Sequence, residues 1–268
     1  MLKNVTQNEF IKYQIILTKF FFKKILKSWK TIFCVIMIIF PVFTAYHKIS
    51  FMLGNPSRYP TITQYDIDYL FFNGFVGFSI LLFRLMYIII FSDIVSGEFS
   101  NKFAMMLYST PPSRKRILLS KVIAIILYST ALELLSFVIV GVVILISTGL
   151  IVSSEVLLVG FLMVFLTFLF SFSISFMLSA LTRNVIVSIL IPILYFFFVE
   201  QFFVIFDLDN ITYYYFVNMM NEVISNYLLT GAIILGIEEV SYLIGLISAP
   251  VIMFLITIFI FNKLDIRT

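Results

Sequence analysis

Residues 93–121 read DIVSGEFSNKFAMMLYSTPPSRKRILLSK and form the one long polar and basic segment that lies between hydrophobic runs. Within it, Glu98–Ser109 can form a short helix with one apolar stripe at helical spacing. The stripe consists of Phe99, Phe103, Met106 and Leu107. The pattern predicts a short amphipathic helix at a membrane surface, placed where it can receive force from a soluble partner.

The second half of this segment contains a stop and a restart. Pro111 and Pro112 end the first helix, because proline lacks the backbone N–H that a helix interior needs. Ser113 is placed to cap a new helix. That helix starts in the basic run Arg114, Lys115 and Arg116 and continues into a hydrophobic run. The basic run also suits simple topology control, but topology control alone does not require an amphipathic helix or a double proline.

Composition predicts the class of protein. Hydrophobic residues make up 62% of the 268 residues and charged residues 12%, against roughly 45–50% and 25% in soluble domains. A chain of this length suffices for six spans with short loops and leaves no room for a soluble catalytic domain. A single cysteine excludes an internal disulfide, and a single histidine excludes a multi-histidine metal site. We therefore expect an all-α polytopic membrane protein.

Six hydrophobic segments are each near or above the ~17 residues that a spanning helix needs. They are Thr31–His47, Tyr69–Phe91, Ile117–Ile146, Val156–Leu181, Val185–Phe206 and Val240–Phe261. The stretch Lys48–Asp68 contains Gly54, Pro56 and Pro60 and is expected to be irregular. Leu228–Ile237 suits a short extracellular or re-entrant helix. We expect one transmembrane domain over 1–268, divided into an N-terminal helix at 1–30, a six-span bundle at 31–261 and a cytoplasmic tail at 262–268.

The first thirty residues have lysines on one helical face and large apolar side chains on another. This pattern predicts a basic amphipathic helix in the membrane interface, with a disordered basic tail as the alternative. Placing both termini in the cytoplasm puts fifteen of the 18 lysines and arginines on the cytoplasmic side. Lipids are thus expected partners, and the positive-inside rule favours a multi-pass membrane protein with both termini inside.

The segment 93–121 also resembles the loop between the second and third spans of type-2 ABC exporter permeases. The matching positions are Gly97, Glu98, Leu107, Thr110, Pro111, Ser113, Arg114 and Lys121. The sequence departs from that pattern at Asn101 and Lys102, where Gly-Thr is common, and at Ser120, where Gly is frequent. Six spans in matching order extend the resemblance over the whole chain.

The resemblance implies a permease subunit without an enzymatic site. It would dimerise with a second copy or a paralogue and bind a separate cytoplasmic ABC ATPase, which would hold ATP and magnesium. The chain has no GxxxxGK[ST] motif, so it does not bind ATP through a P-loop of its own, and no cofactor or nucleic-acid partner is expected. The coupling residues would be Glu98, Phe99, Phe103, Met106, Leu107, Arg114, Lys115 and Arg116. The exported substrate would be a hydrophobic peptide, an antibiotic or a lipid.

Two ionisable residues, Arg84 and Glu133, lie within predicted spans, where charge is expensive. Their similar depth suggests an ion pair between the second and third spans; the alternative is that each is accommodated locally. The same two residues carry the competing hypothesis of an ATP-independent secondary transporter or channel, and a non-transporting membrane anchor is a third possibility. Thr167, Ser171, Ser175 and Ser179 recur at every fourth position of the fourth span. Such a stripe favours close helix packing and could also line a translocation path.

Overall fold

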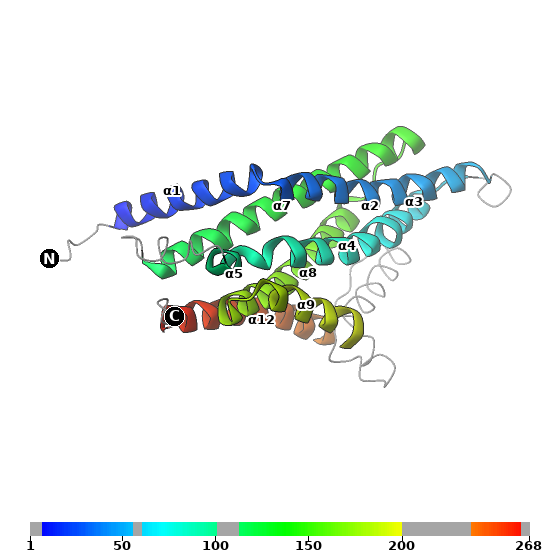
Figure 1. The fold of residues 1–268 in the computed structure, drawn as a ribbon. Helices are drawn as coiled ribbons and strands as arrows, with labels where there is room; N and C mark the ends of the chain where they lie inside the picture. The colour runs from blue at the N-terminus through cyan, green and yellow to red at the C-terminus, as the bar shows by residue number, and fades with distance from the viewer. Residues whose placement is uncertain (1–6, 56–60, 101–112, 200–236, 264–268) are drawn as a thin grey trace.

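The computed structural model describes residues 7–55, 61–100, 113–199 and 237–263. Within these ranges, every regular element is a helix (Figure 1). In chain order they are α1 (Gln7–Leu26), α2 (Trp29–Leu53), α3 (Gln64–Leu70), the π-helix η1 (Phe71–Val76), α4 (Gly77–Phe91), α5 (Asp93–Ser100), α7 (Arg114–Thr148), α8 (Ser154–Thr182), α9 (Val185–Leu194), the π-helix η2 (Tyr195–Val199) and α12 (Ile237–Lys263).

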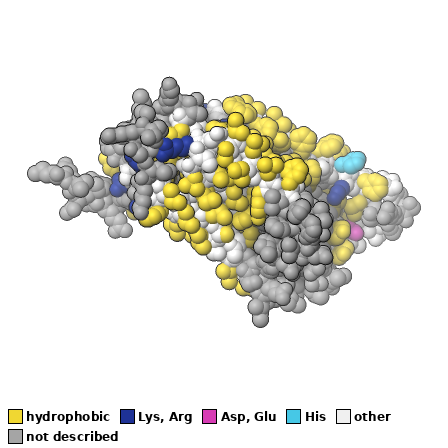
Figure 2. Space-filling view, turned by 60° about the horizontal axis from the view of Figure 1, so that its bottom comes forward, with side chains coloured by type: hydrophobic (Ala, Val, Ile, Leu, Met, Phe, Trp, Pro, Cys, Tyr) yellow, Lys and Arg dark blue, Asp and Glu magenta, His cyan; other side chains and the backbone are white. Residues whose placement is uncertain are grey.

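In the part of the chain that the structure describes, five stretches of helix are long and apolar enough to cross a membrane. They are Trp29–Leu53, Gln64–Phe99, Arg114–Thr148, Ser154–Thr182 and Leu243–Phe261. Figure 2 shows apolar side chains over the middle of the molecule, with lysine, arginine, histidine and acidic groups toward its two ends. The all-α, multi-pass class predicted from composition is therefore confirmed. Six spans stay a prediction, because the shorter apolar helix Val185–Phe198 ends close to residues outside the described ranges. The predicted helix Leu228–Ile237 lies outside these ranges except for its last residue.

The prediction that Lys48–Asp68 is irregular is wrong at both ends of that stretch. α2 continues through Leu53, and α3 begins at Gln64. Thr63 caps α3 in a reciprocal arrangement, since its side chain accepts from the Asp66 backbone N–H while the Asp66 carboxylate accepts from the Thr63 backbone N–H. The polar residues that made this stretch resemble a loop are helix-terminus signals.

Asp68 of α3 joins this helix to the start of α8, and it is 4% exposed. Its carboxylate accepts from the backbone N–H of Ser153 at 2.9 Å and from the Ser153 hydroxyl at 2.8 Å. Ser153 is the residue that precedes α8, so Asp68 holds the start of α8 in place and puts a carboxylate near the helix N-terminus. Gly149 ends the preceding helix α7 with a φ of 73°, a left-handed conformation that favours glycine.

The core of the bundle is built from aromatic side chains of η1, α4, α7 and α8. The Tyr87 and Phe168 ring centroids lie 4.5 Å apart, and Phe75 meets Phe137 edge-on at 5.0 Å. Gly160 of α8 lies where this packing is tightest, because a Cβ added there would come within 2.8 Å of a Val76 methyl group. The backbones of α8 and η1 can therefore approach closely only while residue 160 has no side chain.

Helix α1 runs beside the first part of α7 and nearly in line with α2 (Figure 1). The Gln14 amide donates to the Ser120 hydroxyl at 2.9 Å, and Phe21 is buried. The 35 residues of α7 are about 52 Å long at ~1.5 Å per residue, longer than a hydrocarbon core of roughly 30 Å. Helix α1 thus packs along the end of α7. The placement of α1 in a membrane interface stays a prediction.

Candidate functional site

The predicted coupling segment Glu98–Ser109 is described only through Ser100, where α5 ends. Phe103, Met106 and Leu107 lie outside the described residues. Helix α5 follows α4 after a break at Ser92. It packs against α8 and α9 and connects in sequence, through residues 101–112, to the start of α7.

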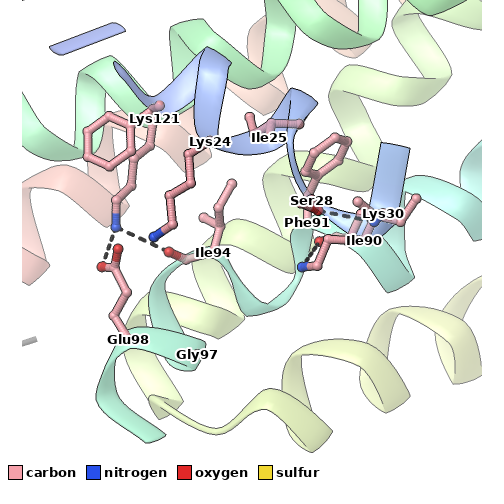
Figure 3. Close-up of a pocket in the computed structure, with 11 residues that line it drawn as sticks. Lys24, Ile25, Ser28, Lys30, Ile90, Phe91, Ile94, Gly97, Glu98 and Lys121 are labelled. Atoms are coloured by element: carbon pink, nitrogen blue, oxygen red, sulfur yellow. Dashed lines mark hydrogen bonds and ion pairs between the residues drawn. The ribbon is translucent and has the colours of Figure 1, made fainter. Parts of the chain in front are cut away.

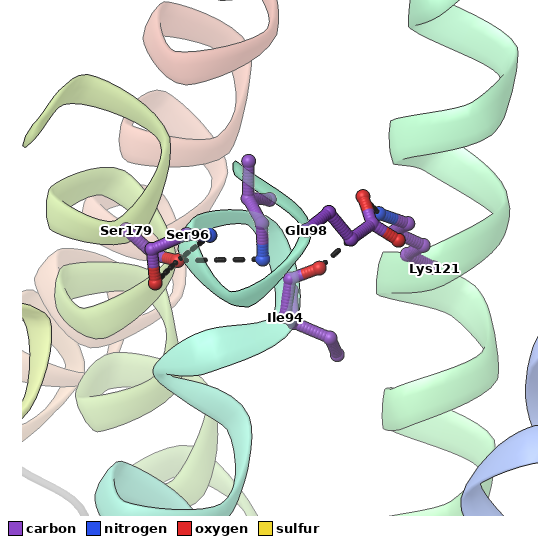
Figure 4. Close-up of polar contacts among 6 residues, drawn as sticks. Ile94, Ser96, Glu98, Lys121 and Ser179 are labelled. Carbon is purple, nitrogen blue, oxygen red and sulfur yellow. Dashed lines mark hydrogen bonds and ion pairs between the residues drawn. The ribbon is translucent and has the colours of Figure 1, made fainter. Parts of the chain in front are cut away.

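Glu98 forms a buried ion pair with Lys121 of α7 (Figure 4). The Lys121 ammonium group is 2% exposed and also donates to the Ile94 carbonyl at 3.1 Å. Glu98 is 7% exposed and contacts its own chain, so its predicted role in coupling would act through this ion pair. This arrangement fastens α5 to α7. The residues are 23 positions apart, so no helical spacing could reveal the pair.

Ser179 fastens the same helix to α8 (Figure 4). Its hydroxyl oxygen accepts from the backbone N–H of Ser96 at 2.9 Å and of Val95 at 3.4 Å. The Ser96 hydroxyl lies 3.0 Å from the Ser179 hydroxyl and 3.4 Å from that of Ser188 in α9. A helix start normally needs partners for its first N–H groups, and here neighbouring spans supply them.

Phe99 and the basic run at the start of α7 differ in their surroundings. Phe99 packs edge-on against Phe261 of α12 at 6.1 Å, and the Arg183 guanidinium lies 4.8 Å from its ring centre. Phe99 is therefore partly buried against its own chain, and its contact with a partner stays a prediction. Arg114 and Arg116 are partly exposed and Lys115 is exposed. Ser113 precedes α7 in the extended conformation typical of a cap residue, without a side-chain cap bond.

Arg84 and Glu133 are both buried but face different neighbours. The Arg84 guanidinium lies over the Phe196 ring of η2, 4.2 Å from its centre, and Arg84 is 6% exposed. Glu133 is fully buried and accepts from the Tyr87 hydroxyl at 3.1 Å. Within the described ranges no ion pair joins the two, so the hypothesised pairing is not formed. The missed partner was Tyr87, which lies three residues beyond Arg84 on the same helix.

The polar stripe of α8 points into the bundle. Ser171, Ser175 and Ser179 are fully buried, and Thr167 is 2% exposed and donates to the Met163 carbonyl at 2.7 Å. Ser171 and Ser175 have no hydrogen-bond partner within the part of the chain that the structure describes. Only Ser179 joins the α5 attachment, so the four residues do not share one role.

A cavity of about 570 Å³ opens beside the Glu98–Lys121 pair (Figure 3). Three lysines from three helices line it: Lys24 of α1, Lys30 of α2 and Lys121 of α7. The Lys30 ammonium group donates to the Ile90 carbonyl at 2.7 Å. In the sequence, Lys24 and Lys30 counted among the lysines of the first thirty residues. Their shared cavity could not be predicted, because it depends on how α1 and α2 pack beside α7.

Within the described ranges, no group of three or more histidine, cysteine, aspartate or glutamate residues is arranged to hold a metal ion. No curated protein and no solved structure matches the chain. A family model described as "Protein of unknown function (DUF2705)" matches residues 32–267, a range that includes α5, Glu133 and the serine stripe. The chain therefore belongs to this family.

Proposed function

We propose that this chain is the permease subunit of an ATP-driven exporter, and that a separate cytoplasmic ABC ATPase moves it through residues 93–121. The observation that supports the proposal best is the double attachment of α5. Its contacts with Lys121 and Ser179 join it to two long helices. A partner that displaced residues 101–112 would pull on α5 and on the start of α7 together, and the movement would pass into α8.

The ion pair and the serine contacts suit this role because both are buried. Breaking a buried ion pair by removing one partner destabilises a protein strongly, by about 3–5 kcal/mol in general. Moving α5 alone therefore costs more than moving α5, α7 and α8 as one unit. In the proposal, the ATPase binds ATP and magnesium, a second permease copy or paralogue completes the path, and both termini lie in the cytoplasm of a bacterium. The substrate class remains a hydrophobic peptide, antibiotic or lipid.

The test is coupled ATP hydrolysis in a reconstituted membrane, with an ABC ATPase that co-purifies with this chain. We expect Phe103→Ala to weaken association with the ATPase, since buried aromatic anchors carry much of an interface energy. We expect Glu98→Gln to leave association intact but to reduce transport-dependent hydrolysis, because it removes the charge that holds Lys121. The exposed Glu155, at the start of α8, gives the matched control Glu155→Gln.

The proposal fails if the chain forms no complex with any such ATPase. It also fails if Phe103→Ala and Glu98→Gln reach wild-type amounts in the membrane and behave like Glu155→Gln. Membrane amount is measured in every variant, so that loss of folding is not taken for loss of coupling.

One observation favours a second candidate, an ATP-independent transporter. Glu133 is fully buried, one carboxylate oxygen accepts from Tyr87, and the other has no hydrogen-bond partner within the described ranges. Intramembrane carboxyl groups commonly belong to proton or ion paths. Uptake or release driven by a proton gradient in vesicles without nucleotide, and lost in Glu133→Gln, would support this candidate over the exporter.

A further inference from the structure

We propose that the cavity between α1, α2, α5 and α7 is a binding site for the phosphate headgroup of an anionic lipid. This proposal does not depend on the exporter function, because it concerns binding alone. It rests on the charge of the cavity lining, on the apolar side chains beside that charge, and on the position of the cavity along the bundle.

The charge of the lining is positive. Lys24, Lys30 and Lys121 contribute three ammonium groups, whereas Glu98 contributes the one carboxylate among the lining residues. In Figure 3, Lys24 and Lys121 extend toward the same region beside Glu98, and Lys30 lies on the other side of the cavity. Lysine binds phosphate as a compact point charge, so the Lys24 and Lys121 ammonium groups, which meet from two helices, suit a phosphate group, and Lys30 adds positive charge across the cavity.

The rest of the lining is mainly apolar, with side chains from α1, α4 and α5. Its apolar side chains are Phe21, Ile25, Ile90, Phe91 and Ile94, and Ser28 and Gly97 complete the lining. A free phosphate ion gains nothing from such a wall, whereas the first carbons of an acyl chain lose contact with water against it. A charged head next to an apolar wall is therefore the arrangement expected for an amphiphile. The volume of about 570 Å³ accommodates a headgroup with the first part of its chains.

The cavity lies beside the start of a helix that is able to cross a membrane, which is where lipid headgroups are expected. Trp29 begins the first helix that is able to cross a membrane, and its neighbours Ser28 and Lys30 line the cavity. Trp29 itself is 68% exposed, as suits a tryptophan at a membrane–water boundary. Basic pockets between helices at this level attract anionic headgroups. The lipid would touch α1, α2, α5 and α7 together and brace the attachment of α5.

The experiment uses Trp29, the single tryptophan of the chain, as a fluorescent reporter. The purified protein is reconstituted in phosphatidylcholine vesicles that contain brominated phosphatidylglycerol or, separately, brominated phosphatidylcholine. Bromine quenches tryptophan at short range, so unequal quenching measures enrichment of one headgroup near Trp29. We expect stronger quenching by phosphatidylglycerol, and we expect Lys24→Gln to reduce that preference about fivefold.

The matched control is Lys23→Gln, which removes the same charge one residue away, from an exposed lysine that does not line the cavity. It should keep the wild-type preference. Inorganic phosphate, added at matched ionic strength, should not reverse the quenching.

Three results would overturn the proposal. Equal quenching by the two headgroups would mean that no anionic site exists. Equal losses in Lys24→Gln and Lys23→Gln would mean that general surface charge is responsible. Reversal by inorganic phosphate would mean that the cavity takes the free anion and not a lipid. Both lysines are exposed, so neither substitution is expected to disturb folding, and size-exclusion profiles check this.

Discussion

Replacing Gly160 by alanine should loosen the contact between α8 and η1. The added Cβ would lie 2.8 Å from a Val76 methyl carbon, 3.5 Å from Phe71 Cε1 and 3.6 Å from Phe137 Cε1. Carbon atoms attract each other best at about 3.5–4.0 Å, so only the first contact is a clash. Val76 is fully buried and β-branched, so its side chain cannot easily rotate away.

The size of the effect follows from two opposing contributions. Overpacking of this kind typically costs about 1–3 kcal/mol. Alanine is favoured over glycine inside a helix by about 0.5–1 kcal/mol. Gly160→Ala should therefore destabilise the protein by roughly 0–2.5 kcal/mol net, taking the two ranges together. Gly141 of α7 is the matched control, because a Cβ there meets nothing within 4 Å, and Gly141→Ala should raise stability.

The assay is heating of detergent-solubilised protein, followed by size exclusion to measure the fraction that stays monodisperse. The ordering expected is Gly141→Ala above wild type and Gly160→Ala below it. In the double variant Gly160→Ala with Val76→Ala, removing the Val76 methyl groups should relieve the clash and give favourable coupling. If Gly160→Ala stabilises as much as Gly141→Ala, and shows no coupling with Val76→Ala, α8 and η1 do not approach as described.

Three other predictions concern charges and topology. Because Arg84 and Glu133 have separate contacts, the losses from Arg84→Ala and Glu133→Ala should add in the double variant, and a partial rescue would show that they interact after all. Asp68→Ala should cost about 1–3 kcal/mol in the same heating assay by removing the charged acceptor of two hydrogen bonds from Ser153, while an unchanged midpoint would mean that these bonds are not needed. In a chain freed of its native cysteine, a cysteine at the exposed Ser154 should react with an impermeant thiol reagent from outside the cell and one at the exposed Lys27 should not; the reverse pattern would invert the topology.

The class of fold could be predicted from the sequence because it depends on bulk composition. A chain that is 62% hydrophobic has too little polar surface for water, wherever its helices begin and end. The helix boundaries were harder to predict. Thr63, Asp66 and Asp68 are polar residues that usually indicate a loop, yet here they cap one helix and fasten another. A local pattern cannot distinguish these roles, since a partner such as Ser153 lies 85 residues away.

The candidate site was predictable as a region but not as a set of contacts. Glu98 and Lys121 both belong to the motif that marked residues 93–121, yet their pairing depends on where α5 lies against α7. The stripe spacing of α8 correctly placed Ser179 on a buried face, without showing that it would accept from the Ser96 backbone. The ion pair between Arg84 and Glu133 was predicted from their similar depth alone. Depth leaves rotation about each helix axis open, and rotation decides which neighbour a side chain meets.

The π-helix η1 affects how this chain can change length during evolution. A π turn closes its hydrogen bonds over one more residue than an α turn, so it accommodates an extra residue within a continuous helix. Deleting one residue from Phe71–Val76 would restore an α-helix and rotate everything before it by about 100° relative to α4. Asp68 would then turn away from Ser153, although the span would stay apolar and long enough. Homologues that lack this residue should therefore also have lost the acidic residue that accepts hydrogen bonds from Ser153 at the start of α8. The insertion of a single codon in η1 thus affects a contact with a residue far away in the sequence.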